Sequence, residues 1–475
     1  MGKNILFSPV GGTDPISWTN GYDGAMLHIA RVYRPDKIIL YLSAEMLAFH
    51  RSDNRYVYCL EKLARLQNRE MPEIEIIERP ELRNVQHFDI FFDEFWKCIN
   101  QNTDEMAEDD ELLLNVSSGT PAMKSGLEVL QTIRGFSRKT RLIQVDTPTK
   151  KMNEHEHEGF DVELAWELNA DNVPDFKDRC HEFECHSLKN IQDEEIIKQL
   201  VKDYDYRAAM AVTKDMPEPN PAYLDKLKLA RARQLLDFST VTKLEKKTGM
   251  DVTPVKGGDA RKSFEYALLL WIKKDRREYV DFCRALTPLI VDLFEQILRR
   301  QCKIDINDYT RWVFPKWVTR KCEEEGLSLK KREERREIER QYGKNKNRQW
   351  DMKKIEKNQA VYSALQDGYR KGFSGKNIGS DHLLKLIEAF CDNRDIRDTA
   401  ARIREVEEAI RNDSAHEMVS VTEEAIEQRT GLTTDKILKL IKRLFDGTGY
   451  PIQDADWDSY HAMNRAIICA VDAGN

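Results

Sequence analysis

Hydrophobic residues in the first 170 positions form short runs rich in strand-forming residues, separated by segments with helical periodicity. The runs cover residues 4–10, 37–42, 73–77, 112–116 and 140–145. Between them, apolar residues recur every three or four positions over residues 24–33, 56–67, 87–100 and 121–132. This alternation of buried strands and helices predicts a mostly parallel, doubly wound α/β sheet.

The pattern changes near residue 172, after which helical spacing dominates and no further strand is predicted. Apolar residues recur at three- and four-residue intervals over residues 194–203, 222–236, 262–273, 279–298, 360–368, 381–390, 395–410 and 434–444. The sequence therefore predicts an α/β domain over residues 1–172 and an all-α region over residues 173–475.

Composition restricts the class of protein further. Of the 475 residues, 41% are hydrophobic and 33% are charged, which is typical of a globular chain with several domains. No apolar run reaches the roughly 20 residues that cross a bilayer, and the nine scattered cysteines indicate reduced thiols. We therefore expect a cytoplasmic protein without a membrane partner. The net charge of -7 means that any contact with nucleic acid needs a local basic patch.

Two loops that follow predicted strands carry residues suited to binding a ligand. Glycines let the backbone approach a ligand, and hydroxyls and free amides at a helix N-terminus bind phosphate. A structural Gly-Gly turn and a Ser/Thr helix cap are the simpler explanations, but one cap needs only one such side chain. Neither loop is a Walker loop or G-x-G-x-x-G, so an ordinary nucleotide is not expected. The candidate ligand-binding residues are Gly11, Gly12, Thr13, Asp14, Asn115, Ser117, Ser118, Gly119, Thr120 and Lys124.

Arg411 and His416 form a third candidate, directly after a predicted helix that ends at residue 410. Imidazole can move the proton of a ribose 2′-hydroxyl or of a leaving oxygen, and guanidinium can stabilise charge that develops on phosphorus. Residues five apart lie about 140° around a continuous helix, so the pair needs a kink or a second subunit to act together. An Arg-x-x-x-x-His string also occurs by chance on protein surfaces.

A metal site is not expected from the histidines and cysteines, because their separations do not match zinc-site pairs. The residues concerned are His155, His157, Cys180, His181, Cys185 and His186.

The segment around residues 312–350 combines tryptophans with basic residues. Trp312, Trp317 and Trp350 are expected to pack in a core or an interface rather than to stack on bases. Residues 330–348 hold nine Lys or Arg and four Glu, which predicts a solvated helix face with i,i+4 pairs. The alternative is that residues 343–348, whose basic residues have no acidic neighbours, attract phosphate.

Taken in order along the chain, these motifs resemble the CARF–HEPN proteins, specifically the stand-alone accessory ribonucleases of type III-A CRISPR systems (the Csm-six family). LFSPVGGTDP…DGAMLHI and LLLNVSSGTPAMKSGL are the segments most similar to that family. The polar Asn412 suits the family's preference after the arginine. The resemblance implies a Rossmann-like CARF domain followed by a helical HEPN domain.

The resemblance further implies a homodimer that binds a cyclic oligoadenylate made by the type III effector complex, with hexa-adenylate favoured over tetra-adenylate. The ten candidate ligand-binding residues would contact this activator. Binding would switch on cleavage of single-stranded RNA at a composite site of Arg411, Asn412 and His416 from both chains. No metal or other cofactor is expected there, and the product ends would be 2′,3′-cyclic phosphate and 5′-hydroxyl.

Two other functions stay open. Some members of the family also degrade their activator, for which Thr13, Asn115 and Ser117 are the candidates. A protein with that activity alone would be indifferent to loss of Arg411 or His416. A regulator that senses a nucleotide without cutting RNA is the other alternative, and residues 422–444 faintly resemble a helix-turn-helix.

Overall fold

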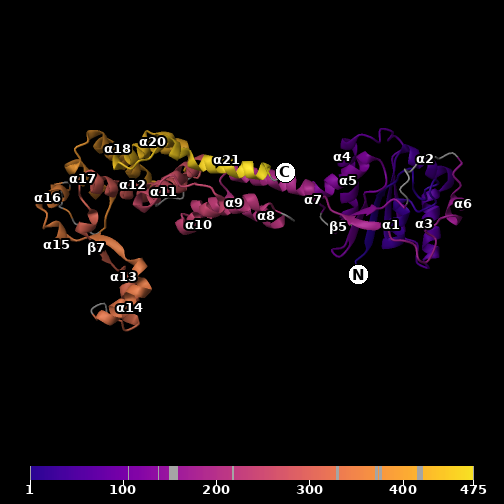
Figure 1. The fold of residues 1–475 in the computed structure, drawn as a ribbon, viewed down its shortest axis with the longest axis horizontal. Helices are drawn as coiled ribbons and strands as arrows, with labels where there is room; N and C mark the ends of the chain where they lie inside the picture. Colours follow the sequence, from indigo (N-terminus) through magenta and orange to yellow (C-terminus); the bar gives the residue numbers. More distant parts are fainter. Residues whose placement is uncertain are drawn as a thin grey trace. The chain divides into compact units, whose positions relative to one another are not determined.

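The computed structural model describes residues 2–104, 106–136, 139–148, 159–216, 219–327, 331–367, 369, 373, 377–414 and 421–473. The chain divides into two compact units (Figure 1). The first contains Met1–Glu195 and Asp215–Glu218, and the second contains Ile196–Lys214 and Pro219–Asn475.

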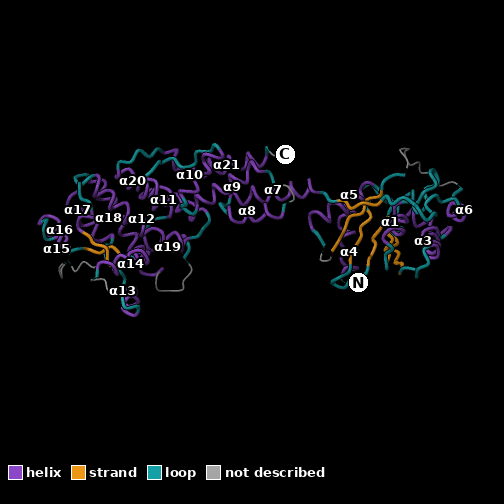
Figure 2. The backbone as a smooth tube through the Cα atoms, turned by 60° about the horizontal axis from the view of Figure 1, so that its bottom comes forward, coloured by secondary structure: helices purple, strands orange, loops and turns teal. Residues whose placement is uncertain are grey.

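The first unit is built on a six-stranded sheet in the order β3-β2-β1-β4-β5-β6. Figure 2 shows the strands in orange. Five strands are parallel, and β6 runs antiparallel to β5 at one edge. The chain order reverses between β1 and β4, which is the place where ligands bind in doubly wound folds. The strands are β1 (Asn4–Pro9), β2 (Lys37–Leu42), β3 (Glu73–Glu78), β4 (Glu111–Asn115), β5 (Lys139–Val145) and β6 (Cys180–Phe183).

Helices cover both faces of this sheet, and each face has its own apolar core. Leu6 of β1 packs with residues of α1 and α3, whereas Ile5 and Phe7 pack with residues of α4 and α5 on the other face. The predicted doubly wound α/β fold is therefore confirmed. The helices are α1 (Ala25–Tyr33), α2 (Ala44–Asp53), α3 (Arg55–Leu66), α4 (Phe88–Thr103), α5 (Pro121–Val129), a π-helical continuation η1 (Leu130–Arg134) and α6 (Val162–Glu167).

The sheet extends beyond residue 172, the end of the predicted α/β domain. Strand β6 comes after that position, and α7 (His186–Lys202) begins before the first unit ends at Glu195. β6 was not predicted because its four residues, Cys-His-Glu-Phe, contain no apolar run.

The second unit is mostly helical, as predicted. The long helix α12 packs against α11, α17, α18 and α20, and it buries apolar residues along its length. Among the described residues, no helix is long and apolar enough to cross a membrane. The helices are α8 (Tyr206–Asp215), α9 (Pro221–Gln234), α10 (Phe238–Thr248), α11 (Gly258–Asp275), α12 (Tyr279–Arg300), α13 (Lys316–Glu324), α14 (Arg332–Tyr342), α15 (Met352–Ile355), α16 (Gln359–Asp367), α17 (Ser380–Phe390), α18 (Arg394–Ser414), α19 (Glu423–Thr430), α20 (Thr434–Thr448) and α21 (Ser459–Asp472).

A short antiparallel ribbon interrupts the helices of the second unit. It consists of β7 (Thr310–Val313) and β8 (Asn347–Trp350), and α13 and α14 lie between the two strands in the chain. Figure 1 shows α13 and α14 projecting from the helices around α12. These two helices have a small core of their own, formed by Val318, Cys322, Ile338 and Tyr342. We call residues 310–350 the arm.

Candidate functional site

The two predicted ligand loops lie side by side at the carboxyl ends of β1 and β4. These strands are adjacent and parallel, with Phe7 opposite Leu114. The loops touch so closely that a Cβ atom on Gly11 would lie 2.7 Å from the backbone nitrogen of Gly119. Gly119 has a φ of 85°, in the region that favours glycine. The sequence thus identified both loops and the end of the sheet that they share.

Asp14 holds the first loop in shape. Its Oδ2 accepts a hydrogen bond from the backbone N–H of Gly11 at 3.0 Å, and its Oδ1 accepts one from Met26 at the start of α1, also at 3.0 Å. Burial raises the pKa of Asp14, and the bonds from Gly11 and Met26 oppose that rise. Because both oxygens are occupied and the side chain is buried, Asp14 supports the pocket from behind.

Asn115 has the same kind of role in the second loop. Its Oδ1 accepts hydrogen bonds from the backbone N–H groups of Ser117 at 2.9 Å and Ser118 at 3.2 Å. Its Nδ2 donates to Ser8 Oγ at 2.8 Å, and the residue is fully buried. Asn115 therefore shapes the turn and links it to β1.

Two hydroxyls of the second loop also make structural bonds. Ser117 Oγ accepts a hydrogen bond from the backbone N–H of Val145 at 2.7 Å, which ties the loop to β5. Thr120 caps α5 by accepting from the N–H of Met123 at 3.4 Å, and its hydroxyl donates to the carbonyl of Val85 at 2.6 Å. The Ser/Thr helix cap considered from the sequence is therefore present at Thr120, next to the turn that Asn115 holds.

These loops enclose a pocket of about 350 Å³. Three of the ten candidate residues, Thr13, Ser117 and Lys124, line it, and the other seven lie in the two loops without lining it. Lys124 takes part in none of the ion pairs found among the described residues, so its charge is available to an anion. The other lining residues are Ser17, Asn20, Asp23, Gly24, Ala25, Val116, Glu128, Gln144, Val145, Asp146, Thr147, Pro148 and Arg179.

A buried charged cluster, not found from the sequence, forms one wall of this pocket. Arg31 Nε donates to Asp23 Oδ2 at 2.6 Å, and Arg179 Nη2 donates to Asp171 Oδ2 at 2.7 Å. The backbone N–H of Asp23 donates to Asp171 Oδ2 at 3.0 Å, which joins the two pairs. Asp23 and Arg179 themselves line the pocket. No local pattern signals the cluster, because its members are up to 156 residues apart in the chain.

The cluster includes a group with metal-ligand chemistry. Donor atoms of Asp23, His28 and Asp171 lie within 4.8 Å of one another. However, the two carboxylates are neutralised by Arg31 and Arg179, and His28 Nε2 accepts the backbone N–H of Arg179 at 3.1 Å. The arrangement is therefore that of a buried ion-pair network.

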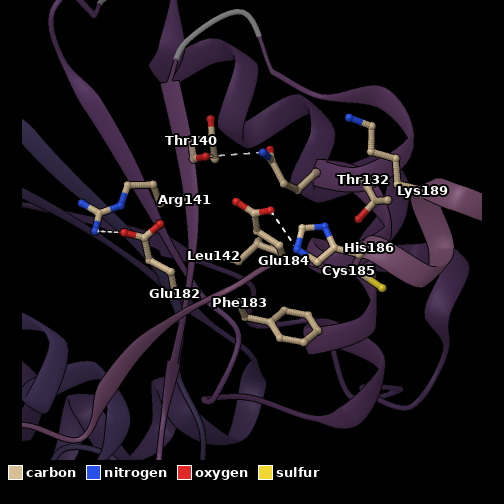
Figure 3. A pocket seen from close by; sticks show the side chains of 11 residues that line it. Thr132, Thr140, Arg141, Leu142, Glu182, Phe183, Glu184, Cys185, His186 and Lys189 are labelled. Carbon is tan, nitrogen blue, oxygen red and sulfur yellow. Dashed lines mark hydrogen bonds and ion pairs between the residues drawn. The ribbon is translucent and has the colours of Figure 1, made fainter. Parts of the chain in front are cut away.

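A second pocket of about 290 Å³ lies at the opposite end of β5 (Figure 3). It is lined by Thr140, Arg141 and Leu142 of β5 and by residues of η1, β6 and α7. In Figure 3, His186 and Glu184 face each other within it, with Nε2 and Oε2 3.2 Å apart. Both side chains are largely exposed, and none of the ten candidate ligand residues lines this pocket.

The third candidate begins on α18. One face of this helix is buried through Ile396, Ala400, Ile403, Val406 and Ile410. The backbone of Arg411 and Asn412 continues the helix from Ile410. The side chains of these two residues, and the whole of His416, lie outside the described residues.

Comparisons with known proteins cover both units. A family model described as the Cas_Csm6 CARF domain matches residues 73–180, and one described as the Cas_Csm6 HEPN domain matches residues 252–468. The CRISPR system endoribonuclease Csm6 of Mycobacterium tuberculosis is 30% identical over 475 residues, which cover 98% of this chain and 99% of the relative. The CRISPR system endoribonuclease Csm6 of Streptococcus thermophilus is 32% identical over 301 residues, 62% of this chain and 66% of the relative.

A solved structure shares the fold. It is Enterococcus italicus Csm6 bound to cyclic hexa-2'-fluoro-hexa-dAMP, with a TM-score of 0.62 and 19% sequence identity. The match covers 98% of this chain and 100% of that chain.

Proposed function

The chain belongs to the Csm6 family of CARF–HEPN proteins, and we propose on this premise that it is a CRISPR endoribonuclease that cleaves single-stranded RNA when a cyclic oligoadenylate is bound. The observation that carries the proposal is the pocket at the β1–β4 switch point, where Thr13, Ser117 and Lys124 face the ligand space. Lys124 supplies a cation for the phosphates, and Gly11 and Gly119 allow the two loops to meet.

The activator we propose is cyclic hexa-adenylate rather than cyclic tetra-adenylate. Its support is the Enterococcus italicus relative, whose structure holds a cyclic hexa-adenylate analogue. One pocket of about 350 Å³ suits a ligand of drug size, for which sites span roughly 300–1,000 Å³. A ring of six nucleotides is several times larger. We therefore propose a homodimer whose two pockets meet across a two-fold axis and hold one ring.

Catalysis is assigned to Arg411 and His416, with Asn412 beside them. His416 would transfer the protons of the 2′-hydroxyl and of the leaving oxygen, and Arg411 would stabilise the charge on the phosphate. We propose that a second copy of the chain completes this site, and the position of Arg411 and Asn412 on α18 is compatible with that arrangement. This chemistry needs no metal ion.

The test is cleavage of a fluorescent single-stranded RNA in EDTA, with no activator, cyclic tetra-adenylate or cyclic hexa-adenylate. Cleavage should appear with the six-membered ring, follow pH near about 6.5, and vanish in His416→Ala, which should still bind the ring. Activity that returns only with magnesium or manganese would contradict the metal-free mechanism. Activator binding by the wild-type protein without any cleavage would favour the regulator.

Degradation of the activator is a second candidate function, favoured by Thr13 and Ser117, which line the pocket. Asn115 is less suited to it, because its amide is buried and used by the turn. Turnover of cyclic hexa-adenylate by His416→Ala, lost in Thr13→Val, would support this activity. An intact ring after long incubation with wild-type protein would exclude it.

A further inference from the structure

The arm exposes two tryptophans that were expected to be packed. Trp312 on β7 is 61% exposed and Trp317 on α13 is 53% exposed, whereas Trp350 on β8 is only 2% exposed. Packing in a core is therefore wrong for Trp312 and Trp317, whereas packing in an interface stays a prediction. Trp350 is buried against Phe373 and His382, which anchors the ribbon. Large aromatic surfaces that stay in water are typical of binding sites.

The basic residues of the arm fall into two groups. Arg335 and Arg340 of α14, and Lys331 directly before it, each pair with a glutamate of this helix, as the solvated-face interpretation predicted. At residues 343–348, the alternative of unpaired phosphate-attracting residues is wrong for two of the three. Lys346 pairs with Glu339 at 3.0 Å, and Arg348 pairs with Glu295.

Other cations of the arm stand close to the exposed tryptophans in the sequence, and one of them, Lys321, contacts the Tyr342 ring. Residues 311–321 contain four basic residues and no acidic one. All four are exposed, and none joins an ion pair in the described part of the chain. They are Arg311, Lys316, Arg320 and Lys321. The whole arm holds 13 Lys or Arg and seven Glu, although the chain has a net charge of -7.

Helix α13 brings Trp317, Arg320 and Lys321 together. Val318 and Cys322 face the small core of the arm, so the neighbouring positions face solvent. Arg320 and Lys321 lie three and four residues after Trp317, on the same side of the helix. The Trp317 ring packs edge-on against Tyr342, with centroids 6.1 Å apart, which fixes its orientation. The result is a held aromatic surface with cations beside it.

We propose that β7 and α13 form a binding surface for single-stranded RNA, in which bases stack on Trp312 and Trp317 while Arg311, Lys316, Arg320 and Lys321 contact the phosphates. This combination of ring faces and a positive surface is how proteins hold unpaired strands without reading their sequence. The proposal rests on the proposed function and deepens it, since the surface would bind substrate RNA within the segment that matches the HEPN domain. Charge favours RNA over a second copy of the arm, because two such surfaces would repel each other.

The test measures RNA binding, which does not require cleavage. Full-length His416→Ala protein is titrated into a fluorescent single-stranded RNA of about 20 nucleotides, longer than the roughly 4–16 nucleotides of comparable sites. Trp312→Ala/Trp317→Ala should raise Kd at least about tenfold, because two bases lose the rings on which they stack. Trp312→Tyr/Trp317→Tyr should restore most of the affinity. The same RNA as a duplex should show no such loss, because its bases are already stacked.

A charge-matched pair of variants isolates the cations. Arg311→Gln/Arg320→Gln should lower the slope of log K against log salt by about 1.4, at roughly 0.7 per phosphate contact. Arg335→Gln/Arg340→Gln removes the same charge from cations that pair with glutamate, and should change the slope by less than half as much.

Several results would overturn the proposal. One is a Kd within about twofold of the parent for the double alanine variant with an unchanged circular dichroism spectrum. Another is an equal loss for duplex RNA. A shifted monomer–dimer equilibrium with unchanged RNA affinity would assign the surface to a protein contact. Wild-type protein that cleaves no RNA with either ring would refute the proposed function. The binding titration tests the RNA-binding surface independently, because it does not require cleavage.

Discussion

Gly11→Ala tests whether the contact between the two loops builds the activator pocket. The added Cβ would lie 2.7 Å from the Gly119 nitrogen, so the loops must move apart by about 0.7 Å to reach an ordinary contact of 3.4 Å. The space beside Gly119 is also filled, because a Cβ added there would lie 2.8 Å from Met123 Sδ and 3.1 Å from Pro9 Cβ. Overpacking of this kind costs roughly 1–3 kcal/mol. Thr13 and Ser117 face the pocket from the two separated loops.

The expected result is a fall of roughly fivefold to a hundredfold in affinity for cyclic hexa-adenylate, since 1.4 kcal/mol corresponds to a factor of ten. The assay is equilibrium binding of a labelled ring to the full-length protein, with a thermal melt beside it. Gly343→Ala is the matched control, because a Cβ at Gly343 meets nothing within 4 Å. Wild-type affinity and an unchanged melt in Gly11→Ala would refute the reasoning, as the loops could then not be packed in this way.

Three further predictions follow from single contacts. Lys124→Gln should weaken activator binding several-fold in the same titration without changing the melting temperature, because Lys124 lines the pocket and forms no ion pair with a described acid. An unchanged affinity would show that Lys124 does not contact the activator. Arg233→Met should lower the free energy of unfolding of the second unit by roughly 3–5 kcal/mol in urea. It removes Arg233 Nε, which lies 2.8 Å from Glu265 Oε2, and leaves the Glu265 carboxylate buried without a partner. A loss below about 1 kcal/mol would mean that Glu265 is solvated. Burial lowers the pKa of His382, whose Nδ1 accepts the N–H of Gly379 at 3.1 Å. Because folding favours the neutral imidazole, the stability of the protein should fall as pH drops below about 6.5. His382→Gln should show a shallower pH dependence of the urea midpoint, and identical pH profiles would contradict this.

The α/β alternation could be predicted because each parallel strand, buried on both faces, leaves a local apolar run. The same logic fails for β6, β7 and β8, which are four residues long and largely polar. Those strands form through pairing with partners elsewhere in the chain, as when Trp312 lies opposite Arg348. A reader of the sequence alone has no local signal for such a pairing.

The position of the two candidate loops was predictable because adjacent parallel strands end at the same edge of a sheet. What each side chain does there was not. Asn115 and Asp14 have residue types that suit a ligand, yet their polar atoms are used by backbone N–H groups. Arg179 reaches the pocket from beyond the predicted domain boundary, through contacts that only the tertiary fold creates. In the same way, burial separates Trp350 from Trp317, although both stand near basic residues.

The division of labour in the pocket has a consequence for how this protein can evolve. Gly11, Gly119, Asp14 and Asn115 are each constrained by the main chain, through a close approach or through hydrogen bonds to backbone groups. A change at any of these four residues would disturb the shape of the pocket, whatever ligand binds there. Thr13 and Lys124 line the pocket and can be substituted individually, whereas Ser117 lines it and also ties its loop to β5 through the N–H of Val145. Selection for a different ligand would therefore change residues that line the pocket first, and it would change the residues that shape the two loops least.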